Sequence, residues 1–389
     1  MPFSRRDALL SAGTLAGAGM VAGRTTTGEN TSSSRPSTDP VCLTDFEPLA
    51  KARVSAMAWE YVNGAAADET TVRWNREAFS RIRLKPRVLN DVSKLDPRVT
   101  LYGHEHQFPI LLAPTAAHKL MHPEGELATA RGAGAAHASF VLSSFSTTRI
   151  EDVAAAAKTP FWFQLYVQPD RGFTRNLVQR AESAGCTALC LTVDTPTAGA
   201  RDRESRAKVS FPPLPNLEGA KQAGGEEYRA AENRIYSAIL DPSLTWNDVE
   251  WLRSFTKVPL LLKGILNASD AEQAVNSGAD GVIVSNHGGR NLDTVPATID
   301  ALPLITEKIG GRVPILMDSG VRRGTDVIKA LALGANGVLI GRPYLYGLAA
   351  DGQNGVTRVL QILQREFLMA MALAGRSSIK QIDRTVLWE

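Results

Sequence analysis

From residue 109 onward, short apolar runs alternate with longer amphipathic stretches. The runs are continuously apolar rather than alternating, which is typical of parallel strands buried on both faces. The stretches between them carry helical patterns, such as residues 270–277, which should begin after Ser269 and stop at Gly278, because glycine commonly ends a helix. Eight strand–helix units predict an α/β fold of the closed (β/α)8, or TIM, barrel type. The eight runs are residues 109–115, 139–144, 161–166, 188–194, 259–263, 281–286, 314–318 and 337–341.

Polar residues stand at the C-terminal ends of these apolar runs. In a (β/α)8 barrel, that rim carries the loops from which active sites are built. A purely structural origin would scatter such residues between both ends of the strands, so their concentration at one end predicts a single site there. They are Thr115, Ser143, Gln164, Tyr166, Thr192, Asp194, Lys263, Asn286, His287, Asp318 and Arg342.

Two segments fall outside the repeating strand–helix pattern. Residues 42–108 precede the first barrel strand, and we expect them to form a small helical cap with a hairpin. The connection after the fourth strand, residues 197–246, is rich in proline, glycine and charge. A long connection without regular structure in a compact domain is usually a lid or a binding loop, so we expect this loop to border the site.

Composition narrows the classes of function. The 389 residues are 44% hydrophobic and 21% charged, and the formal net charge of +3 gives no reason to expect nucleic acid. Cys42, Cys186 and Cys190 lack the regular spacing of a disulfide framework, and the last two flank an apolar run, so we expect them to be buried. The His104-Glu105-His106 run lies in an expected surface turn without further ligands, so no metal site is predicted.

The N-terminus has the layout of a twin-arginine export signal. Arg5 and Arg6 precede a weakly apolar stretch, residues 8–23, which is too short and too rich in glycine to span a membrane stably. A Ser/Thr/Pro-rich stretch follows, residues 24–40, and is expected to be a disordered linker. We therefore expect residues 1–40 to be signal and linker, residues 41–389 to be the barrel domain, and the protein to be exported to the periplasm or cell exterior.

Residues 285–293 read Ser-Asn-His-Gly-Gly-Arg-Asn-Leu-Asp. This motif resembles the signature of the flavin-dependent 2-hydroxy-acid oxidases and dehydrogenases, a family that includes glycolate oxidase, lactate oxidase, mandelate dehydrogenase and flavocytochrome b2. The resemblance covers about residues 44–385. It extends to Ala-Pro-Thr at 113–115, His-Pro-Glu-Gly-Glu at 122–126, Gln-Leu-Tyr at 164–166, Thr-Val-Asp-Thr-Pro at 192–196, Lys-Gly at 263–264, Gly-Val-Arg-Arg-Gly-Thr-Asp at 320–326 and Gly-Arg-Pro at 341–343.

The resemblance implies FMN-dependent oxidation of L-2-hydroxy acids, L-lactate or longer, to 2-oxo acids, with dioxygen reduced to hydrogen peroxide. A flavin is required because a side chain cannot accept two electrons from an unactivated carbon. Two alternatives stay open: a dehydrogenase that passes electrons to a quinone or cytochrome, and an FMN-dependent isomerase or non-catalytic flavin-binding barrel. The expected partners are a small 2-hydroxy acid, dioxygen or another acceptor, and further copies of the chain in a homotetramer or larger assembly. An exported enzyme of this kind would fold around FMN in the cytoplasm before export.

The resemblance also assigns catalytic and substrate-binding roles. His287 is the expected base, because neutral imidazole can accept a proton near neutral pH. Asp194 would orient that imidazole and stabilise its protonated form. Tyr166 would direct its hydroxyl at the substrate oxygen. The expected contacts of the substrate carboxylate are Arg290, Arg201 and Tyr61, and Arg201 could swing in with the loop after the fourth strand.

The remaining matches are expected to hold FMN. Lys263 would lie where negative charge collects on the reduced flavin. Phosphate binding after the seventh and eighth strands is a habit of this fold. FMN is favoured over FAD because no second nucleotide-binding unit is visible in the sequence. The predicted FMN-binding residues are Pro114, Thr115, Ala116, Ser143, Gln164, Thr192, Lys263, Ser285, Asp318, Ser319, Gly320, Arg322, Gly341 and Arg342.

Three positions depart from the family pattern. Phe145 stands where glycolate oxidases carry Trp, and Ala198 stands where they carry Leu. Both are smaller, which predicts extra room beside the substrate side chain. Ser319 replaces a common glycine in the phosphate loop, and its hydroxyl can also hydrogen-bond phosphate.

Overall fold

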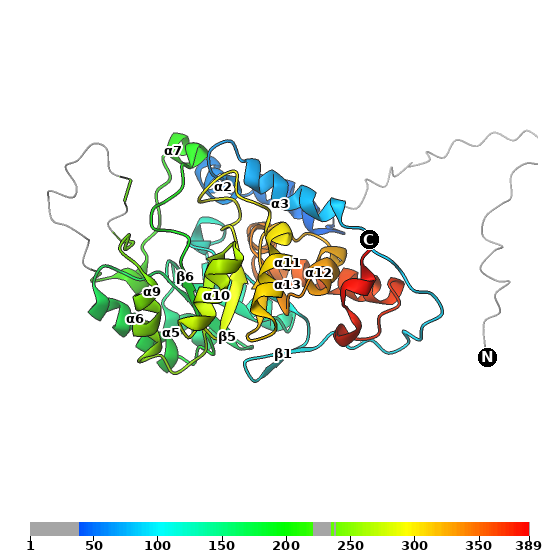
Figure 1. Cartoon of the computed structure of the whole chain (residues 1–389). Helices are drawn as coiled ribbons and strands as arrows, with labels where there is room; N and C mark the ends of the chain where they lie inside the picture. Colours follow the sequence, from blue (N-terminus) through cyan, green and yellow to red (C-terminus); the bar gives the residue numbers. More distant parts are fainter. Residues whose placement is uncertain (1–38, 221–234, 237–238, 389) are drawn as a thin grey trace, which may run out of the picture. The chain divides into compact units, whose positions relative to one another are not determined.

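Eight parallel strands close into a barrel in the computed structural model, which describes residues 39–220, 235–236 and 239–388 (Figure 1). The strand order is β10-β3-β4-β5-β6-β7-β8-β9, so the last strand pairs with the first, for example Val338 with Ile110. All eight predicted strands are confirmed, in the predicted order. Their bounds are β3 Ile110–Leu112, β4 Phe140–Ser143, β5 Phe161–Leu165, β6 Leu189–Thr192, β7 Leu260–Ile265, β8 Gly281–Val284, β9 Ile315–Met317 and β10 Gly337–Ile340.

Helices alternate with these strands and cover the outside of the barrel. The helix predicted at residues 270–277 forms, but it begins earlier than expected, because the side chain of Asn267, not Ser269, caps it by accepting from the backbone N–H of Asp270. The last helix is kinked at Asp351 and Gly352, whose backbone angles are not helical. The barrel helices are α4 Gly125–Ala135, α5 Ile150–Ala156, α6 Arg171–Ser183, α9 Trp246–Arg253, α10 Ala268–Asn276, α11 Thr298–Ile309, α12 Gly324–Ala332 and α13 Arg342–Leu373.

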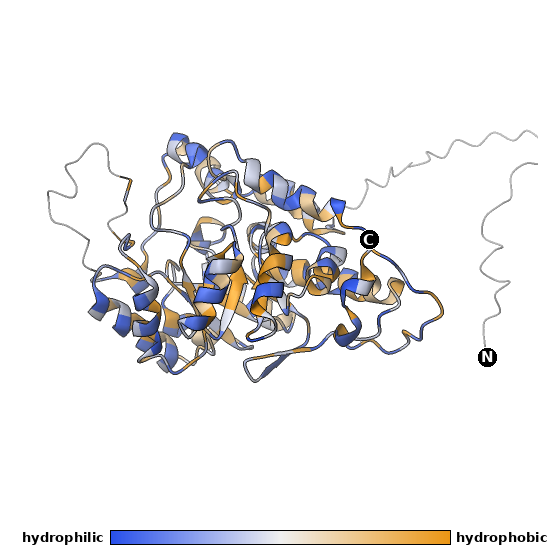
Figure 2. Cartoon of the chain, viewed as in Figure 1, coloured by the Kyte–Doolittle hydropathy of each residue, from blue (hydrophilic) through white to orange (hydrophobic). Residues whose placement is uncertain are grey.

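The apolar residues divide into two clusters that explain why the strands read as continuously apolar. One fills the barrel interior, and the other lies between the strands and the helices. Figure 2 shows the resulting pattern, in which apolar strands lie inside and the outer helices present polar faces. Cys186 and Cys190 are buried, as predicted, and form no disulfide within the described ranges. The interior cluster contains Leu101, Leu111, Ala113, Val141, Trp162, Ala188, Cys190, Leu261, Ile283, Leu316 and Leu339.

The segment before the barrel forms the predicted helical cap and hairpin. The helices are α1 Phe46–Lys51, α2 Ala56–Asn63 and α3 Thr70–Arg81, and the hairpin pairs β1 Val99–Leu101 with β2 His104–His106. The cap and the hairpin lie at opposite ends of the barrel (Figure 1). Leu101 packs into the interior cluster, and the Tyr102 hydroxyl donates to the carbonyl of Asp280, just before β8.

One expectation for this hairpin was wrong. The His104-Glu105-His106 run is a strand rather than a surface turn, and His106 is buried with Nδ1 bonded to the hydroxyl of Ser139. Within the described part of the chain, no cluster of three or more His, Cys, Asp or Glu side chains is placed to hold a metal ion.

The long loop after β6 is more ordered at its start than expected. It contains α7, Asp202–Ala207, and a short 3-10 helix, Pro215–Leu217. The predicted signal and most of the linker lie outside the described residues, and Pro40–Glu389 form one compact unit. No helix among the described residues is long and apolar enough to cross a membrane.

Candidate active site

A cavity of about 350 Å³ opens at the C-terminal ends of the barrel strands. The strand ends, the cap and the loop after β6 all contribute to its wall, which confirms the expectation that this loop borders the site. Of the residues predicted for the site, only Asp194, Ser285 and Asn286 do not line the cavity, and all three contact residues that do. The predicted residues that line it are Tyr61, Pro114, Thr115, Ala116, Ser143, Gln164, Tyr166, Thr192, Arg201, Lys263, His287, Arg290, Asp318, Ser319, Gly320, Arg322, Gly341 and Arg342.

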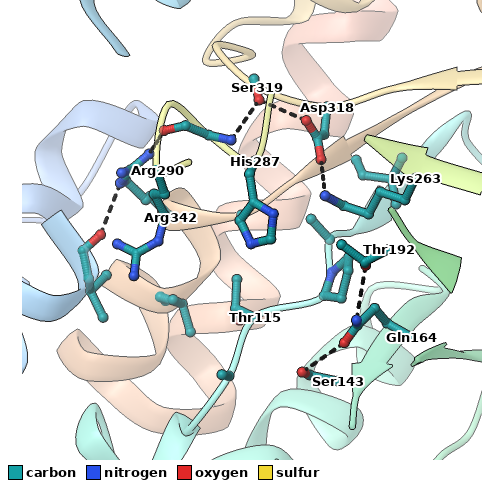
Figure 3. Close-up of a pocket in the computed structure, with 18 of the residues that line it drawn as sticks. Thr115, Ser143, Gln164, Thr192, Lys263, His287, Arg290, Asp318, Ser319 and Arg342 are labelled. Carbon is teal, nitrogen blue, oxygen red and sulfur yellow. Dashed lines mark hydrogen bonds and ion pairs between the residues drawn. The ribbon is translucent and has the colours of Figure 1, made fainter. Parts of the chain in front are cut away.

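His287 presents one ring nitrogen to the cavity and the other to Asp194. Its Nδ1 lies 2.9 Å from Asp194 Oδ1, and its Nε2 lies 3.3 Å from the hydroxyl of Tyr166. Figure 3 shows the imidazole at the centre of the site, between the arginines and Lys263. A proton on Nδ1 bonded to the carboxylate leaves the Nε2 lone pair available on the cavity side.

Burial lowers the pKa of His287 below its ordinary value, and Asp194 only partly opposes this effect. Burial alone would raise the pKa of Asp194, but the attraction of His287 and the hydrogen bond to it hold that pKa below its ordinary value. Burial also raises the pKa of Tyr166 to about 12. At neutral pH the site therefore holds a neutral imidazole, a carboxylate and a protonated phenol, the arrangement required of a general base.

The loop that carries His287 has an unusual backbone. His287, Gly288 and Gly289 have φ values of 58°, 67° and 73°, three left-handed residues in a row. A side chain in this region costs free energy, so surrounding contacts must hold it there. Each of the three backbone N–H groups donates to a side-chain oxygen, and the acceptors are Ser285 Oγ at 3.1 Å, Ser319 Oγ at 3.1 Å and Asn286 Oδ1 at 3.2 Å.

The cap contributes a buried amide pair to the same loop, and Asn75 of α3 was not predicted from the sequence. Asn75 Nδ2 donates to Asn286 Oδ1 at 2.9 Å, and Asn286 Nδ2 donates to Asn75 Oδ1 at 2.7 Å. Both residues are at most 3% exposed. The signal in the sequence was an amide on the buried face of an amphipathic helix, a face that Asn75 shares with Thr71, Ala78 and Phe79.

A buried ion pair lies on the other side of His287. Lys263 Nζ is 3.2 Å from Asp318 Oδ2, and Ser285 Oγ bonds to both groups. Burial alone would lower the pKa of Lys263, but Asp318 and Asp194 raise it above its ordinary value, so this lysine stays charged. Ser319 donates to Asp318 Oδ1 at 2.7 Å, which connects the ion pair to the loop of His287.

Three strand ends form a polar row beside the lysine. Gln164, on β5, accepts from Ser143 of β4 at 3.0 Å and donates to Thr192 of β6 at 2.9 Å (Figure 3). This row fits the hydrogen-bonding edge of a flat heterocycle, and Lys263 fits a place where negative charge develops on it.

Two of the cavity's arginines form no ion pair with any acidic residue that the structure describes. Among the described residues, the guanidinium of Arg322 donates only to the backbone carbonyl of Val321, and no carboxylate lies within ion-pair distance of the guanidinium of Arg322 or Arg76. Burial lowers the pKa of Arg322, and the nearby charge of Arg76 adds to this effect. Arg322 is partly buried and Arg76 is exposed, and two cations without a counter-ion at one end of the cavity favour an anion between them. This end of the cavity therefore fits a phosphate. Arg76 was not predicted, because it lies in the cap rather than at a strand end.

Arg342 has protein partners that the sequence did not predict. Its guanidinium donates to the carbonyls of Val62 and Gly64 in the cap and Gly288 in the loop of His287. Burial lowers its pKa to about 10. Arg342 thus joins the cap to the loop of the base, and a contact from it to phosphate stays a prediction.

The two arginines expected at the substrate are next to each other. Arg290 lies over the ring of Tyr61, 5.0 Å from its centroid, and Arg201 donates to the carbonyl of Arg290 at 3.0 Å. Arg201 is thus already inside the site rather than on a mobile part of the loop. Sequence reasoning missed their common partner, Glu204 of α7, which lies 2.8 Å from Arg290 Nη2.

Comparison with known proteins agrees with this geometry. A peroxisomal (S)-2-hydroxy-acid oxidase of Oryza sativa subsp. japonica is 49% identical over 348 residues, which cover 89% of this chain and 95% of that protein. An L-lactate oxidase of Nostoc sp. is 47% identical over 357 residues, covering 90% and 98%. A solved mandelate oxidase variant with (S)-mandelic acid superposes with a TM-score of 0.81 at 36% identity, covering 90% and 98%. Residues 50–389 match the model of the FMN-dependent dehydrogenases, and the chain therefore belongs to this FMN-dependent family.

Proposed function

We propose that this protein oxidises small L-2-hydroxy acids to 2-oxo acids and reduces dioxygen to hydrogen peroxide. The observation that carries the proposal is the position of His287, whose Nε2 faces the cavity while Nδ1 is held by Asp194, beside Tyr166 and Arg290. The relatives described above are named as oxidases of (S)-2-hydroxy acids and L-lactate. Bound FMN supplies the acceptor for the two electrons, which no side chain can provide.

The residues around the cavity bind the substrate, accept its proton and stabilise the charge that develops. Arg290 and Tyr61 hold the substrate carboxylate and orient the α-carbon toward His287. His287 Nε2 takes the substrate proton, and Asp194 stabilises the imidazolium that results. Tyr166 donates a hydrogen bond to the substrate oxygen. Lys263 remains charged beside the polar row and so stabilises negative charge that develops there.

An isomerase or a non-catalytic flavin-binding barrel would not require this arrangement. One cavity holds a base, His287, which a carboxylate orients, and it also holds two arginines next to that base. Those groups serve proton removal from an anionic substrate, so the oxidation of 2-hydroxy acids is the better account of the site.

The test is direct. L-lactate added without oxygen to the purified yellow protein should bleach its flavin absorbance, and D-lactate should not. Admitting air should then restore the colour with peroxide formed in proportion to pyruvate. Bleaching that only an artificial dye or a quinone reverses would instead identify a dehydrogenase. No bleaching with any member of a panel of L-2-hydroxy acids would contradict the proposal.

The pocket should prefer L-lactate or longer substrates to glycolate. Phe145 and Ala198 both line the cavity, together with the apolar side chains of Phe211 and Leu214. A substrate methyl group can fill this apolar space and gains about 0.8 kcal/mol per methylene buried, whereas glycolate leaves it empty. Phe145→Trp combined with Ala198→Leu should therefore shift the ratio of kcat/KM values from L-lactate toward glycolate. A wild-type preference for glycolate over both L-lactate and L-2-hydroxybutyrate would contradict this view of the pocket.

We also propose export by the twin-arginine route and self-association into a homotetramer or larger assembly. Arg5 and Arg6, outside the described residues, support the first. The exposed apolar side chains of Met369, Leu373 and Trp388 near the C-terminus support the second. Cell fractionation of the wild type and of an Arg5→Lys/Arg6→Lys variant tests export. Sedimentation of the purified protein tests self-association.

A further inference from the structure

Glu204 bridges the two arginines of the candidate site. Its Oε1 lies 2.8 Å from Arg290 Nη2, and its Oε2 lies 3.5 Å from Arg201 Nη1. The side chains of these three residues are only 12 to 18% exposed. Glu204 does not itself line the cavity, whereas both arginines do. Its carboxylate therefore acts on the site from behind, through the guanidinium groups.

The start of the loop after β6 is held in place so that Glu204 reaches this position. Arg203, the neighbouring residue of α7, pairs with Glu60 of α2 and lies 3.3 Å from Glu69, so α7 sits against the cap (Figure 1). At Gly199, a Cβ would meet the backbone oxygen of Asn291 at 2.2 Å, so only glycine permits this close approach. These contacts place Glu204 between the arginines independently of any substrate.

The donors that remain on Arg290 suffice for one carboxylate. Its Nη1 donates to the carbonyls of Tyr61 and Gly64, and its Nη2 donates once to Glu204. Among the described residues, no group accepts from Nε or from the second Nη2 proton. Nε and Nη2 lie on the same edge of the guanidinium, and such an edge matches the two oxygens of a single carboxylate.

The charges at the site also limit the substrate to one carboxylate. Two guanidinium groups and one carboxylate leave this corner of the cavity with a net charge of +1, which a substrate monoanion neutralises. The rest of the wall beside the substrate side chain is apolar, through Phe145, Phe211 and Leu214. A second substrate carboxylate would therefore be desolvated without a counter-ion, at a large cost in free energy.

We propose that Glu204 is a specificity-determining residue that restricts the enzyme to monocarboxylic 2-hydroxy acids by cancelling one of the two cationic charges at the site. The inference rests on the proposed oxidation of 2-hydroxy acids. It assigns Glu204 no part in the chemical step.

Glu204→Gln tests the proposal because glutamine keeps the shape and removes the charge. We expect the ratio of kcat/KM for L-malate to kcat/KM for L-lactate to rise about tenfold or more in this variant, since one unit charge is uncovered a few ångströms from the substrate. Glu60→Gln is the matched control. It removes one of the two carboxylates that pair with Arg203 and keeps the other, Glu69, so α7 stays against the cap and Glu204 stays on the arginines. Its ratio should therefore stay within about twofold of the wild type.

A binding measurement keeps the test valid if Glu204→Gln turns over slowly. Propanoate and malonate, a monoanion and a dianion that carry no oxidisable hydroxyl, are titrated into the oxidised holoenzyme and followed by the change in flavin absorbance. Malonate should gain affinity relative to propanoate in Glu204→Gln but not in Glu60→Gln. Equal shifts in both variants, or none in either, would overturn the role of Glu204. Failure of the wild type to oxidise any 2-hydroxy acid would overturn the proposed function instead, and the binding ratio would still decide the role of Glu204.

Discussion

His287 combines a left-handed backbone, a buried ring and a carboxylate partner in one residue. His287→Gln should leave FMN bound, because the side chain that replaces the imidazole is of similar size and Lys263, Gln164 and Arg322 are untouched. Reduction of the flavin by L-lactate should slow by at least about 10²-fold, the usual lower range for loss of a general base. Stopped-flow absorbance measures this rate, and a rate equal to that of the wild type would refute the role of His287.

The same experiment extends to pH. Because burial lowers the pKa of His287, its neutral form persists below the ordinary value of 6.5. The kcat/KM of the wild type should thus hold on going down through pH 6.5 and fall only at more acidic pH, as the imidazole takes up a proton. The residual activity of His287→Gln should lack this acidic limb.

Ser319 shows how one hydroxyl can offset a strained backbone. Its φ is 72°, a region that favours glycine, yet its Oγ accepts from Gly288 and donates to Asp318. Ser319→Ala keeps the strain and loses both hydrogen bonds, whereas Ser319→Gly loses the bonds and relieves the strain. We expect Ser319→Ala to lower the free energy of unfolding by about 1–3 kcal/mol and Ser319→Gly to lower it less. Urea unfolding of the two holoproteins measures the difference. A Ser319→Gly protein less stable than Ser319→Ala would show that the left-handed backbone holds no strain that glycine relieves.

At the scale of elements, helix α3 helps to shape the loop of the base through Asn75. Asn75→Ala removes one half of the buried amide pair and leaves Asn286 without its partner, which should cost about 1–3 kcal/mol of stability. The loop of His287 should also become less well placed, so we expect kcat to fall more than the affinity for a substrate analogue. Ser80→Ala, on the exposed face of the same helix, is the matched control and should change neither. An Asn75→Ala enzyme with wild-type kcat would show that α3 only covers the cavity.

The elements predicted best from the sequence are those whose burial leaves a periodic pattern. The barrel strands are buried on both faces and therefore read as apolar runs, and their polar ends correctly located the cavity. Helix α7 was missed because its six residues bury no side chain and so carry no apolar stripe. Glu204 lies in that charged run, which resembles a solvated surface. Its pairing with Arg290 depends on a contact between residues 86 positions apart, which no local pattern encodes.

At the scale of the whole molecule, His106 makes stability depend on pH far from the active site. Burial, with a smaller effect of His104, lowers its pKa from 6.5 to about 4, so the folded protein holds it neutral. The unfolded chain takes up a proton near pH 6.5, whereas the folded one does so only near pH 4. The stabilising contribution is therefore complete above about pH 6.5 and is lost progressively between pH 6.5 and 4, by up to about 3 kcal/mol.

Comparison with His106→Asn isolates this effect from that of the carboxyl groups, which titrate in both proteins. The free energy of unfolding at saturating FMN should fall more steeply from pH 7 to pH 5 in the wild type than in the variant. Parallel pH dependences would show that His106 is protonated as readily in the fold as in the unfolded chain.

The pairing of β3 with β10 also sets the order of events during synthesis. Leu111, in the first barrel strand, has its neighbour Leu339 only after more than two hundred further residues have been added. Until then the strands made so far have two open, apolar edges, which is the state in which partly folded chains aggregate. Gly341, Arg342 and the contacts of Arg342 with the cap come later still. The pocket therefore cannot form before β10 and Arg342 have been made, and a stop codon shortly before β10 would yield a protein with no site rather than a weakened one.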